Sequence, residues 1–169
     1  MPTKRAPFLP PRWVIRGAWV LHRALYSVSG GRIGLGTPTG KSYGTLRLHT
    51  TGRKTGAPRV AMLGYFEDGP NLFTLAMNGW GEPEPAWWLN LQANPDVTVE
   101  LPSGPRRVHA RVATGDERAR LWAEMKHHTP NLEGYAARRS GETAVVVFEP
   151  RAAPGPVSAT SPDSSNNPG

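Results

Sequence analysis

The spacing of apolar residues changes along the chain from a helical period to a strand period. In residues 12–28, Arg12, Arg16 and Arg23 fall near one another at about 100° per residue, and apolar side chains cover much of the remaining helix surface. This pattern predicts an amphipathic helix, which ends at the glycines that follow. From residue 44 onward apolar and polar residues alternate, as is typical of strands.

The alternating part of the chain predicts a series of short elements. We expect strands at 44–50, 59–66, 72–76, 97–101, 107–113 and 143–149, and helices at 86–93, 116–127 and 131–139. Asp68-Gly69-Pro70-Asn71 and Pro102-Ser103-Gly104-Pro105 are the turns of two predicted hairpins. Strands outnumber helices and the connections are short. The predicted fold is therefore mainly β, an antiparallel barrel with a few helices over it.

The length of 169 residues favours one domain. Residues 1–11 contain four prolines and are predicted to be a flexible lead-in. Residues 151–169 are rich in Pro, Ser and Asn without a periodic apolar pattern, and we expect a disordered tail there. A single domain over residues 12–150 remains.

The composition excludes several classes of protein. There is no cysteine, so no disulfide, thiolate zinc site or cysteine nucleophile is available. His109, His127 and His128 lack the spacing of zinc ligands, and no metal site is expected. No run approaches the roughly 20 apolar residues that a membrane-spanning helix needs. Without a recognisable secretory leader, a cytoplasmic location is the expectation.

Positive charge is concentrated in the N-terminal part of the chain. Of 20 basic and 13 acidic residues, eleven basic and no acidic ones precede Glu67. Such an asymmetry predicts an anionic partner for this part. Cofactor phosphate, an anionic membrane surface contacted by the helix at 12–28, and nucleic acid remain open on charge alone.

A phosphate-binding loop of the ATP- and GTP-binding type is not predicted, although Gly36-Thr37-Pro38-Thr39-Gly40-Lys41-Ser42 resembles one. That loop needs four residues between its glycines to wrap a phosphate, and this chain has three.

A stronger candidate for anion binding is the segment 50–59, Thr-Thr-Gly-Arg-Lys-Thr-Gly-Ala-Pro-Arg. It lies between two predicted strands and should form a tight turn. Three cations, hydroxyl groups and backbone N–H donors are the groups that bind phosphate. The alternative from these ten residues alone is a solvated basic hairpin turn.

A second candidate segment is 80–95, which contains Trp87 and Trp88 beside a proline-rich loop. The two tryptophans could cap the barrel core, as aromatic residues usually do. They also begin a predicted helix, whose free N–H groups could face a ligand.

Together these segments resemble the deazaflavin (F420)-dependent nitroreductase family of actinobacteria. The resemblance runs through TTGRKTGAPR, YFEDG, PAWWLNLQANPDVTVE and VVVFEP, and covers roughly residues 44–150. It implies a split β-barrel related to flavin-binding oxidoreductases. It also implies a reductase that uses the reduced coenzyme F420, whose phosphate and acidic tail suit the acid-free part of the chain.

The resemblance also assigns residues to the cofactor. It implies that the phosphate and acidic tail bind Arg53, Lys54, Thr55 and Arg59. It further implies that the deazaflavin ring lies beside Met62, Ala76, Met77, Asn78, Gly79, Ala86, Trp87 and Trp88. Met77 and Asn78 depart from the family pattern, in which a hydroxyl residue and then a basic residue are common.

The expected reaction is hydride transfer to an electron-poor small molecule such as a quinone, an enone or a nitroaromatic compound. The segment that is often tyrosine-rich in nitroreducing members has only Tyr135 here, which favours quinones and enones. We take Tyr135 as the candidate for orienting the acceptor or supplying a proton. A half-buried packing role is its alternative.

Other functions follow from the same features. A non-catalytic carrier of fatty acids or other apolar ligands could use the same barrel. Flavin mononucleotide is a weaker candidate cofactor. Nucleic acid is not expected as a partner, because the positive charge is confined to one helix and one turn. The sequence is compatible with a monomer or a homodimer.

Overall fold

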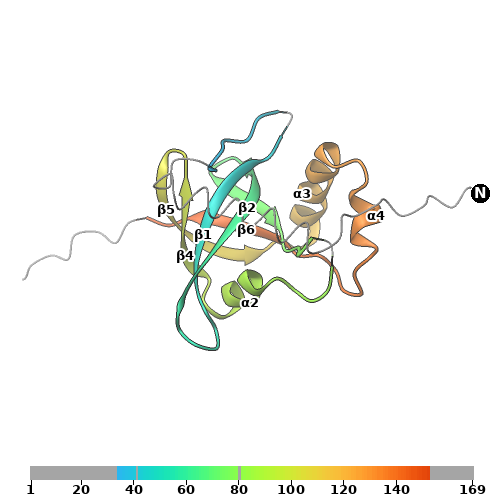
Figure 1. Cartoon of the computed structure of the whole chain (residues 1–169). Helices are drawn as coiled ribbons and strands as arrows, with labels where there is room; N and C mark the ends of the chain where they lie inside the picture. The colour runs from blue at the N-terminus through green and yellow to red at the C-terminus, as the bar shows by residue number, and fades with distance from the viewer. Residues whose placement is uncertain (1–33, 41, 80, 153–169) are drawn as a thin grey trace, which may run out of the picture.

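Six antiparallel strands close into a barrel in the order β1-β2-β3-β6-β5-β4 (Figure 1). The structure, a computed structural model, describes residues 34–40, 42–79 and 81–152. The lead-in at 1–11, the helix at 12–28 and most of the tail lie outside the described residues. The predicted mainly β barrel is confirmed.

The elements follow the chain in a simple order. They are β1 (Gly44–Thr51), β2 (Pro58–Asp68), β3 (Asn71–Leu75), α2 (Ala86–Ala93), β4 (Asp96–Leu101), β5 (Gly104–Val112), α3 (Gly115–His128), α4 (Leu132–Ala136) and β6 (Val145–Pro150). Every strand pair is antiparallel, and the pairing of β1 with β4 closes the barrel. The prediction of a helix at 86–93 matches α2 in full.

Several predicted boundaries differ from the structure; β6, predicted at 143–149, spans Val145–Pro150. The hairpin between β4 and β5 turns over two residues instead of four, because Gly104 already pairs with Leu101. The helix predicted at 131–139 ends at Ala136 as α4. Beyond it, the N–H groups of Arg138 and Arg139 bond to carbonyls three residues back, at 3.2 and 3.0 Å, so the chain tightens into a turn.

Two apolar clusters form the core, one inside the barrel and one between the barrel and α3. Strand β6 serves both, because alternate side chains point to opposite faces of a strand. Val146 and Phe148 lie in the cluster inside the barrel. Val145 and Val147 pack with Leu121 of α3 in the second cluster. This double burial explains why β6 is continuously apolar instead of alternating.

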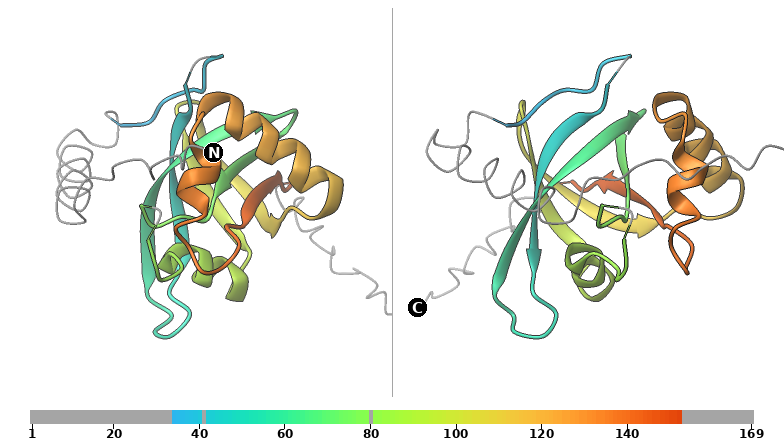
Figure 2. Two further views of the ribbon diagram at one scale, coloured as in Figure 1. Left: turned by 90° about the vertical axis from the view of Figure 1, so that its right-hand side faces the viewer. Right: turned by 45° about the vertical axis from the view of Figure 1, so that its right-hand side comes forward.

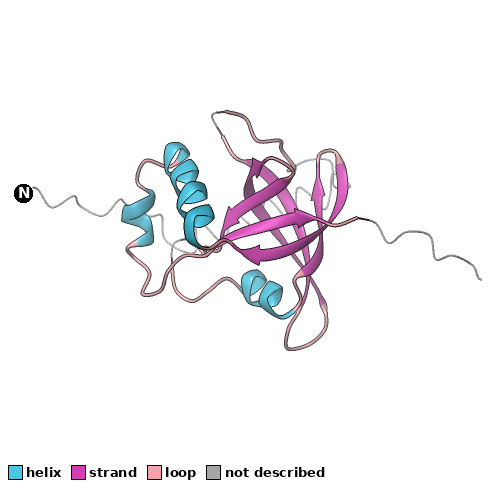
Figure 3. Ribbon diagram, turned by 180° about the vertical axis from the view of Figure 1, so that it is seen from behind, coloured by secondary structure: helices cyan, strands magenta, loops and turns pink. Residues whose placement is uncertain are grey.

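The helices cover the barrel at two places. Helix α2 lies at one end of the barrel, where Trp88 and Leu91 enter the inner cluster. Helices α3 and α4 lie together on one side, as Figures 2 and 3 show from several directions. Within the described part of the chain, no helix is both long and apolar enough to cross a membrane.

The loop before β1 folds back against the start of that strand. Gly36 and Thr45 exchange two backbone hydrogen bonds, at 3.0 and 2.8 Å, and a strand follows where a phosphate-binding loop would need a helix. Gly44, the first residue of β1, packs against this loop. A Cβ atom on Gly44 would be 2.6 Å from the Gly36 carbonyl oxygen, from Pro38 Cδ and from Tyr65 Cε1.

Replacing Gly44 with alanine should destabilise the protein, because backbone and ring atoms would have to move. Overpacking of this kind lowers the free energy of unfolding by about 1–3 kcal/mol. Urea denaturation measures the effect. Gly40→Ala is the control, because a Cβ there meets nothing within 4 Å. Equal unfolding free energies for the two variants would contradict the close packing of the loop and Tyr65 against Gly44.

Candidate functional site

The turn between β1 and β2 is tightly closed, as its sequence predicts. The Gly52 N–H donates to the Ala57 carbonyl at 2.8 Å, and the Gly56 N–H donates to the Gly52 carbonyl at 2.7 Å. Gly56 has a φ of 67°, which glycine adopts without steric penalty. These bonds narrow the turn and direct the side chains at positions 53–55 toward solvent.

The cations of this turn are exposed and have no carboxylate partner in the described part of the chain. Among the described residues, no acidic group forms an ion pair with Arg53, Lys54 or Arg59. All three side chains are exposed, and so is Thr55 between them. A group of unpaired cations on a closed turn can bind a polyanionic ligand.

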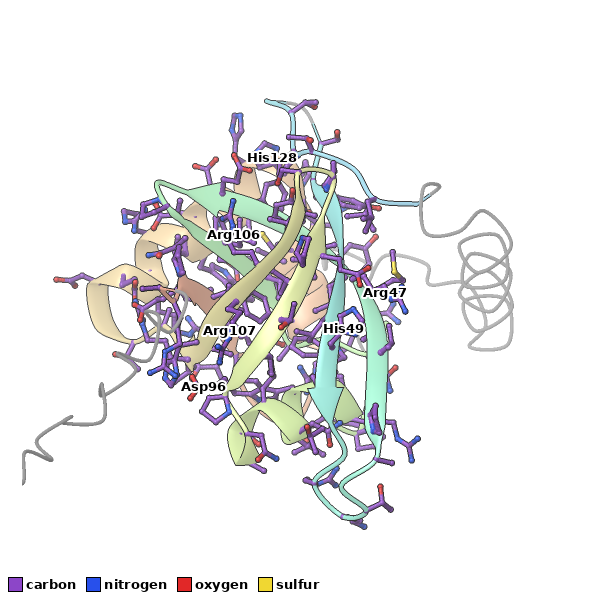
Figure 4. All side chains as sticks on the ribbon, turned by 90° about the vertical axis from the view of Figure 1, so that its left-hand side faces the viewer. Arg47, His49, Asp96, Arg106, Arg107 and His128 are labelled. Atoms are coloured by element: carbon purple, nitrogen blue, oxygen red, sulfur yellow. The ribbon has the colours of Figure 1, made fainter. Side chains whose placement is uncertain are left out.

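Two basic side chains of β1 have a carboxylate partner within the protein. Arg47, on β1 in the acid-free part of the chain, donates to Glu100 at 3.3 Å, and His49 contacts the same carboxylate at 2.8 Å. Figure 4 shows Arg47 and His49 on the outer face of β1. The anion-binding capacity of the described N-terminal part is therefore concentrated at the β1–β2 turn.

Asn90 of α2 joins this turn to the second candidate segment. Its side-chain Oδ1 accepts the Arg53 N–H at 3.1 Å, and its Nδ2 donates to Thr50 Oγ1 at 3.2 Å. Asn90 is 5% exposed; its bond to Thr50 is buried, and the bond it accepts from Arg53 is partly buried. Sequence reasoning missed this residue. A polar residue on the buried side of a short apolar helix was the available signal.

The first turn of α2 presents the three predicted residues in different ways. Ala86 is exposed and Trp87 is half-buried, whereas Trp88 is buried in the inner cluster. The Trp88 N–H already donates to the Pro85 carbonyl at 3.0 Å. The N–H groups of Ala86 and Trp87 precede the first helical bonds and have no partner within the helix. The first turn of α2 contains no acidic residue.

Met62 lies on the outside of the barrel wall. It pairs with Arg47 in the β1–β2 register, and it therefore faces outward while Leu46 and Leu48 point inward. Met62 is nevertheless only 6% exposed.

The loop after β3 contains the remaining predicted ring contacts. Ala76 is buried and receives a sheet-like hydrogen bond, with its N–H donating to the Ala144 carbonyl at 2.9 Å. Met77 and Asn78 are exposed, and Gly79 has a φ of 59°. Ala76 therefore anchors the loop, while the next residues project from it.

A buried arginine fastens this loop to the segment that precedes β6. Arg139 donates to the Ala76 carbonyl at 2.7 Å and to Glu84 Oε1 at 2.5 Å. Nearby, Glu82 accepts the Ser140 N–H at 2.8 Å and the Ser140 hydroxyl at 2.9 Å. These bonds, first that of the N–H, hold the pKa of Glu82 below its usual value. Sequence reasoning missed Arg139 and Glu84, which are 55 positions apart.

Tyr135 lies on α4 and is half-buried. Figures 1 and 3 show α4 on the far side of α2 from the β1–β2 turn. The structure therefore brings the basic turn together with α2, and the 76–79 loop together with the segment that follows α4. Tyr135 lies on α4, just before that segment.

Comparison with known proteins identifies the family. The model of a family described as F420H(2)-dependent quinone reductase matches residues 19–150. An F420H(2)-dependent quinone reductase of Mycobacterium tuberculosis is 38% identical over 149 residues, which are 83% of this chain and 97% of the relative.

Solved structures give a similar picture. A structure described as an F420-H2 dependent reductase is 26% identical and has a TM-score of 0.56, covering 62% of this chain and 93% of its own. Another, described as a domain-swapped dimer, is 24% identical with a TM-score of 0.59; it covers 79% of this chain and 99% of its own, and supports the fold alone. The extent of the family match and of the mycobacterial similarity shows that the chain belongs to the F420H(2)-dependent quinone reductase family, a family of oxidoreductases with coenzyme F420 as cofactor.

Proposed function

We propose that this protein reduces quinones with reduced F420, which it binds between the β1–β2 turn and the 76–79 loop. The observation that carries the proposal is the group of exposed, unpaired cations on a turn that Asn90 fastens to α2. An anionic cofactor fits this donor set. In the proposal, Arg53, Lys54, Thr55 and Arg59 hold the phosphate and acidic tail.

The ring end of the cofactor is assigned to the segments beside α2. The outward-facing Met62 and the loop residues Ala76–Gly79 would border the ring. The N–H groups of Ala86 and Trp87 would offer hydrogen bonds to ring carbonyls, with Trp88 packing behind them. Backbone donors at a helix start suit this role because they stabilise negative charge.

Reduced F420 supplies a hydride when bound, and the quinone that accepts it takes one further proton to become a hydroquinone. The protein's part is to hold donor and acceptor in contact, because orientation accounts for much of the rate of such a transfer. Tyr135 is proposed to orient the acceptor or to donate that proton through its hydroxyl. Enones and nitroaromatic compounds share the electron-poor character of quinones and are proposed as poorer acceptors.

The tail assignment predicts a loss of affinity when two cations of the turn are removed. Arg53→Ala/Lys54→Ala should raise the Kd for F420 by about a hundredfold or more, because two cations are removed and each hydrogen bond to a charged group contributes roughly 1.5–3 kcal/mol. Quenching of tryptophan fluorescence during titration measures the Kd.

Two comparisons separate specific contacts from general charge effects. Arg107→Ala/Lys126→Ala removes two exposed charges elsewhere and should leave the Kd nearly unchanged. A deazaflavin that lacks the phosphate and acidic tail should bind wild type and the Arg53/Lys54 variant alike. Equal losses in both double variants would contradict the assignment of the tail to this turn.

The acceptor assignment predicts an order of reactivity. Oxidation of reduced F420, followed by the return of its visible absorption, should be faster with a benzoquinone or naphthoquinone than with an enone or nitroaromatic compound of similar size. The comparison is made as kcat/KM, because this ratio measures discrimination between substrates. A nitroaromatic compound that exceeds every quinone tested would overturn the proposed acceptor class.

Tyr135→Phe should lower kcat for a quinone and leave the Kd for F420 unchanged. A general acid typically contributes about 10²–10⁴-fold to the rate, and the loss should approach the lower figure where water replaces the hydroxyl. Steady-state kinetics and fluorescence titration give the two constants. Tyr43→Phe, at an exposed tyrosine, is the control. An unchanged kcat in Tyr135→Phe would remove this hydroxyl from the reaction.

A further inference from the structure

The side chain of Arg139 is buried and its charge is used inside the protein. Only 1% of the side chain is exposed. One terminal nitrogen donates to the Ala76 carbonyl at 2.7 Å and to Thr143 Oγ1 at 3.2 Å, and the other donates to Glu84 at 2.5 Å. The guanidinium thus joins two ends of one loop, at 76 and at 84, to the segment before β6.

The neighbouring contacts reinforce the same connection. Ser140 bonds to Glu82 through its N–H and its hydroxyl, and Ala76 donates to the Ala144 carbonyl. Figure 2 shows the segment between α4 and β6 running beside the loop that leads to α2. Residues 139–144 therefore support the whole loop that carries Met77, Asn78 and Gly79.

Stability alone does not explain this arrangement. Arg139 Nε and Glu84 Oε2 are buried, and neither has a hydrogen-bond partner among the described residues. Buried ion pairs are often replaceable by apolar side chains of similar volume without loss of stability, and incomplete hydrogen bonding makes such a pair less favourable still. What the guanidinium provides, and an apolar residue does not, is a fixed position for the Ala76 carbonyl.

We propose that Arg139, held by Glu84, is a positioning residue that fixes the 76–79 loop against the deazaflavin ring. The inference rests on the proposed function, in which this loop borders the ring. Arg139 acts through the loop and is not itself in contact with the reacting atoms. Because Asn90 holds the tail-binding turn and Arg139 holds the loop, the two cofactor ends have separate supports.

Separate supports predict separate effects on binding and turnover. Arg139→Met keeps a long side chain but removes all three hydrogen bonds. It should lower kcat by about tenfold to a hundredfold, because a misplacement of about 1 Å is enough for such a loss. The Kd for F420 should change much less than kcat, because the phosphate and acidic tail stay bound at the β1–β2 turn, which Arg139 does not contact.

Amide hydrogen exchange tests whether Arg139 holds the 76–79 loop in place, without any turnover. In cofactor-free protein, Arg139→Met should speed exchange in peptides that cover residues 76–85 and leave peptides over the 52–57 turn unchanged. The visible absorption band of bound F420 should also shift relative to wild type, because the surroundings of the ring change. Arg139→Lys, which retains a charge for Glu84, and Glu84→Gln should give intermediate values.

Arg120→Met is the matched control. It removes a two-bond arginine–carboxylate pair, at 2.7 and 2.8 Å to Asp68, from an exposed position on α3. It should change neither the exchange of residues 76–85 nor kcat. Unchanged loop exchange in Arg139→Met, or faster exchange with unchanged kcat and an unchanged F420 spectrum, would overturn the inference.

The outcome for the proposed function is read separately. A wild-type protein that binds F420 but reduces no quinone would refute the proposed acceptor. The exchange and absorption measurements would still decide the role of Arg139.

Discussion

The side-chain amide of Asn90 is the contact on which the organisation of the site depends. One end of this amide accepts the backbone N–H of Arg53, and the other donates to Thr50 at the end of β1. The bond to Thr50 is buried and the bond from Arg53 is partly buried. An unpaired buried polar group costs about 1–3 kcal/mol, so the paired arrangement is favoured. The hairpin turn is thereby fixed to α2, whose Trp88 and Leu91 fill the end of the barrel.

Several basic residues away from the β1–β2 turn form ion pairs with carboxylates. Arg106 and Arg107 on β5 form none among the described residues. Arg111 donates to both oxygens of Glu117 at 2.6 and 2.8 Å, and this pairing holds the pKa of Glu117 below its usual value. The cations at 53, 54 and 59 have no such partner among the described residues. An external anion would neutralise these cations, and the cofactor of this family is anionic.

Much of the fold could be predicted from the sequence because it depends on local patterns. Alternation along β1, the Asp68–Asn71 turn and the bounded apolar run of α2 each contain their own signal within a few residues. The error at α4 arose where local pattern and tertiary contact disagree. Residues 137–139 continue a helical pattern, yet the chain tightens after Ala136 and the Arg139 guanidinium bonds to Ala76 and Glu84.

The site was predictable only in its exposed parts. The basic turn could be recognised because its composition is chemically unusual. Asn90, Arg139 and Glu84 could not, since each acts through hydrogen bonds to residues far away in the sequence. In a sequence, a buried arginine and a solvated one look the same. Their difference depends on which loop the fold brings within about 3 Å, and that is decided by the packing of the whole barrel.

The segment from Tyr135 to Thr143 links the two chemical requirements of the proposed reaction. Tyr135 belongs to α4, and four residues later Arg139 forms hydrogen bonds to the loop assigned to the ring. A group that would meet the acceptor and a group that would place the hydride donor therefore lie on one short stretch of backbone. Leu132, three residues before that stretch, packs in the apolar cluster between the barrel and α3, and Thr143 at its end accepts a hydrogen bond from Arg139. Hydride transfer depends on the relative placement of donor and acceptor. If one segment supports both groups, the distance between donor and acceptor stays constant when a neighbouring loop moves.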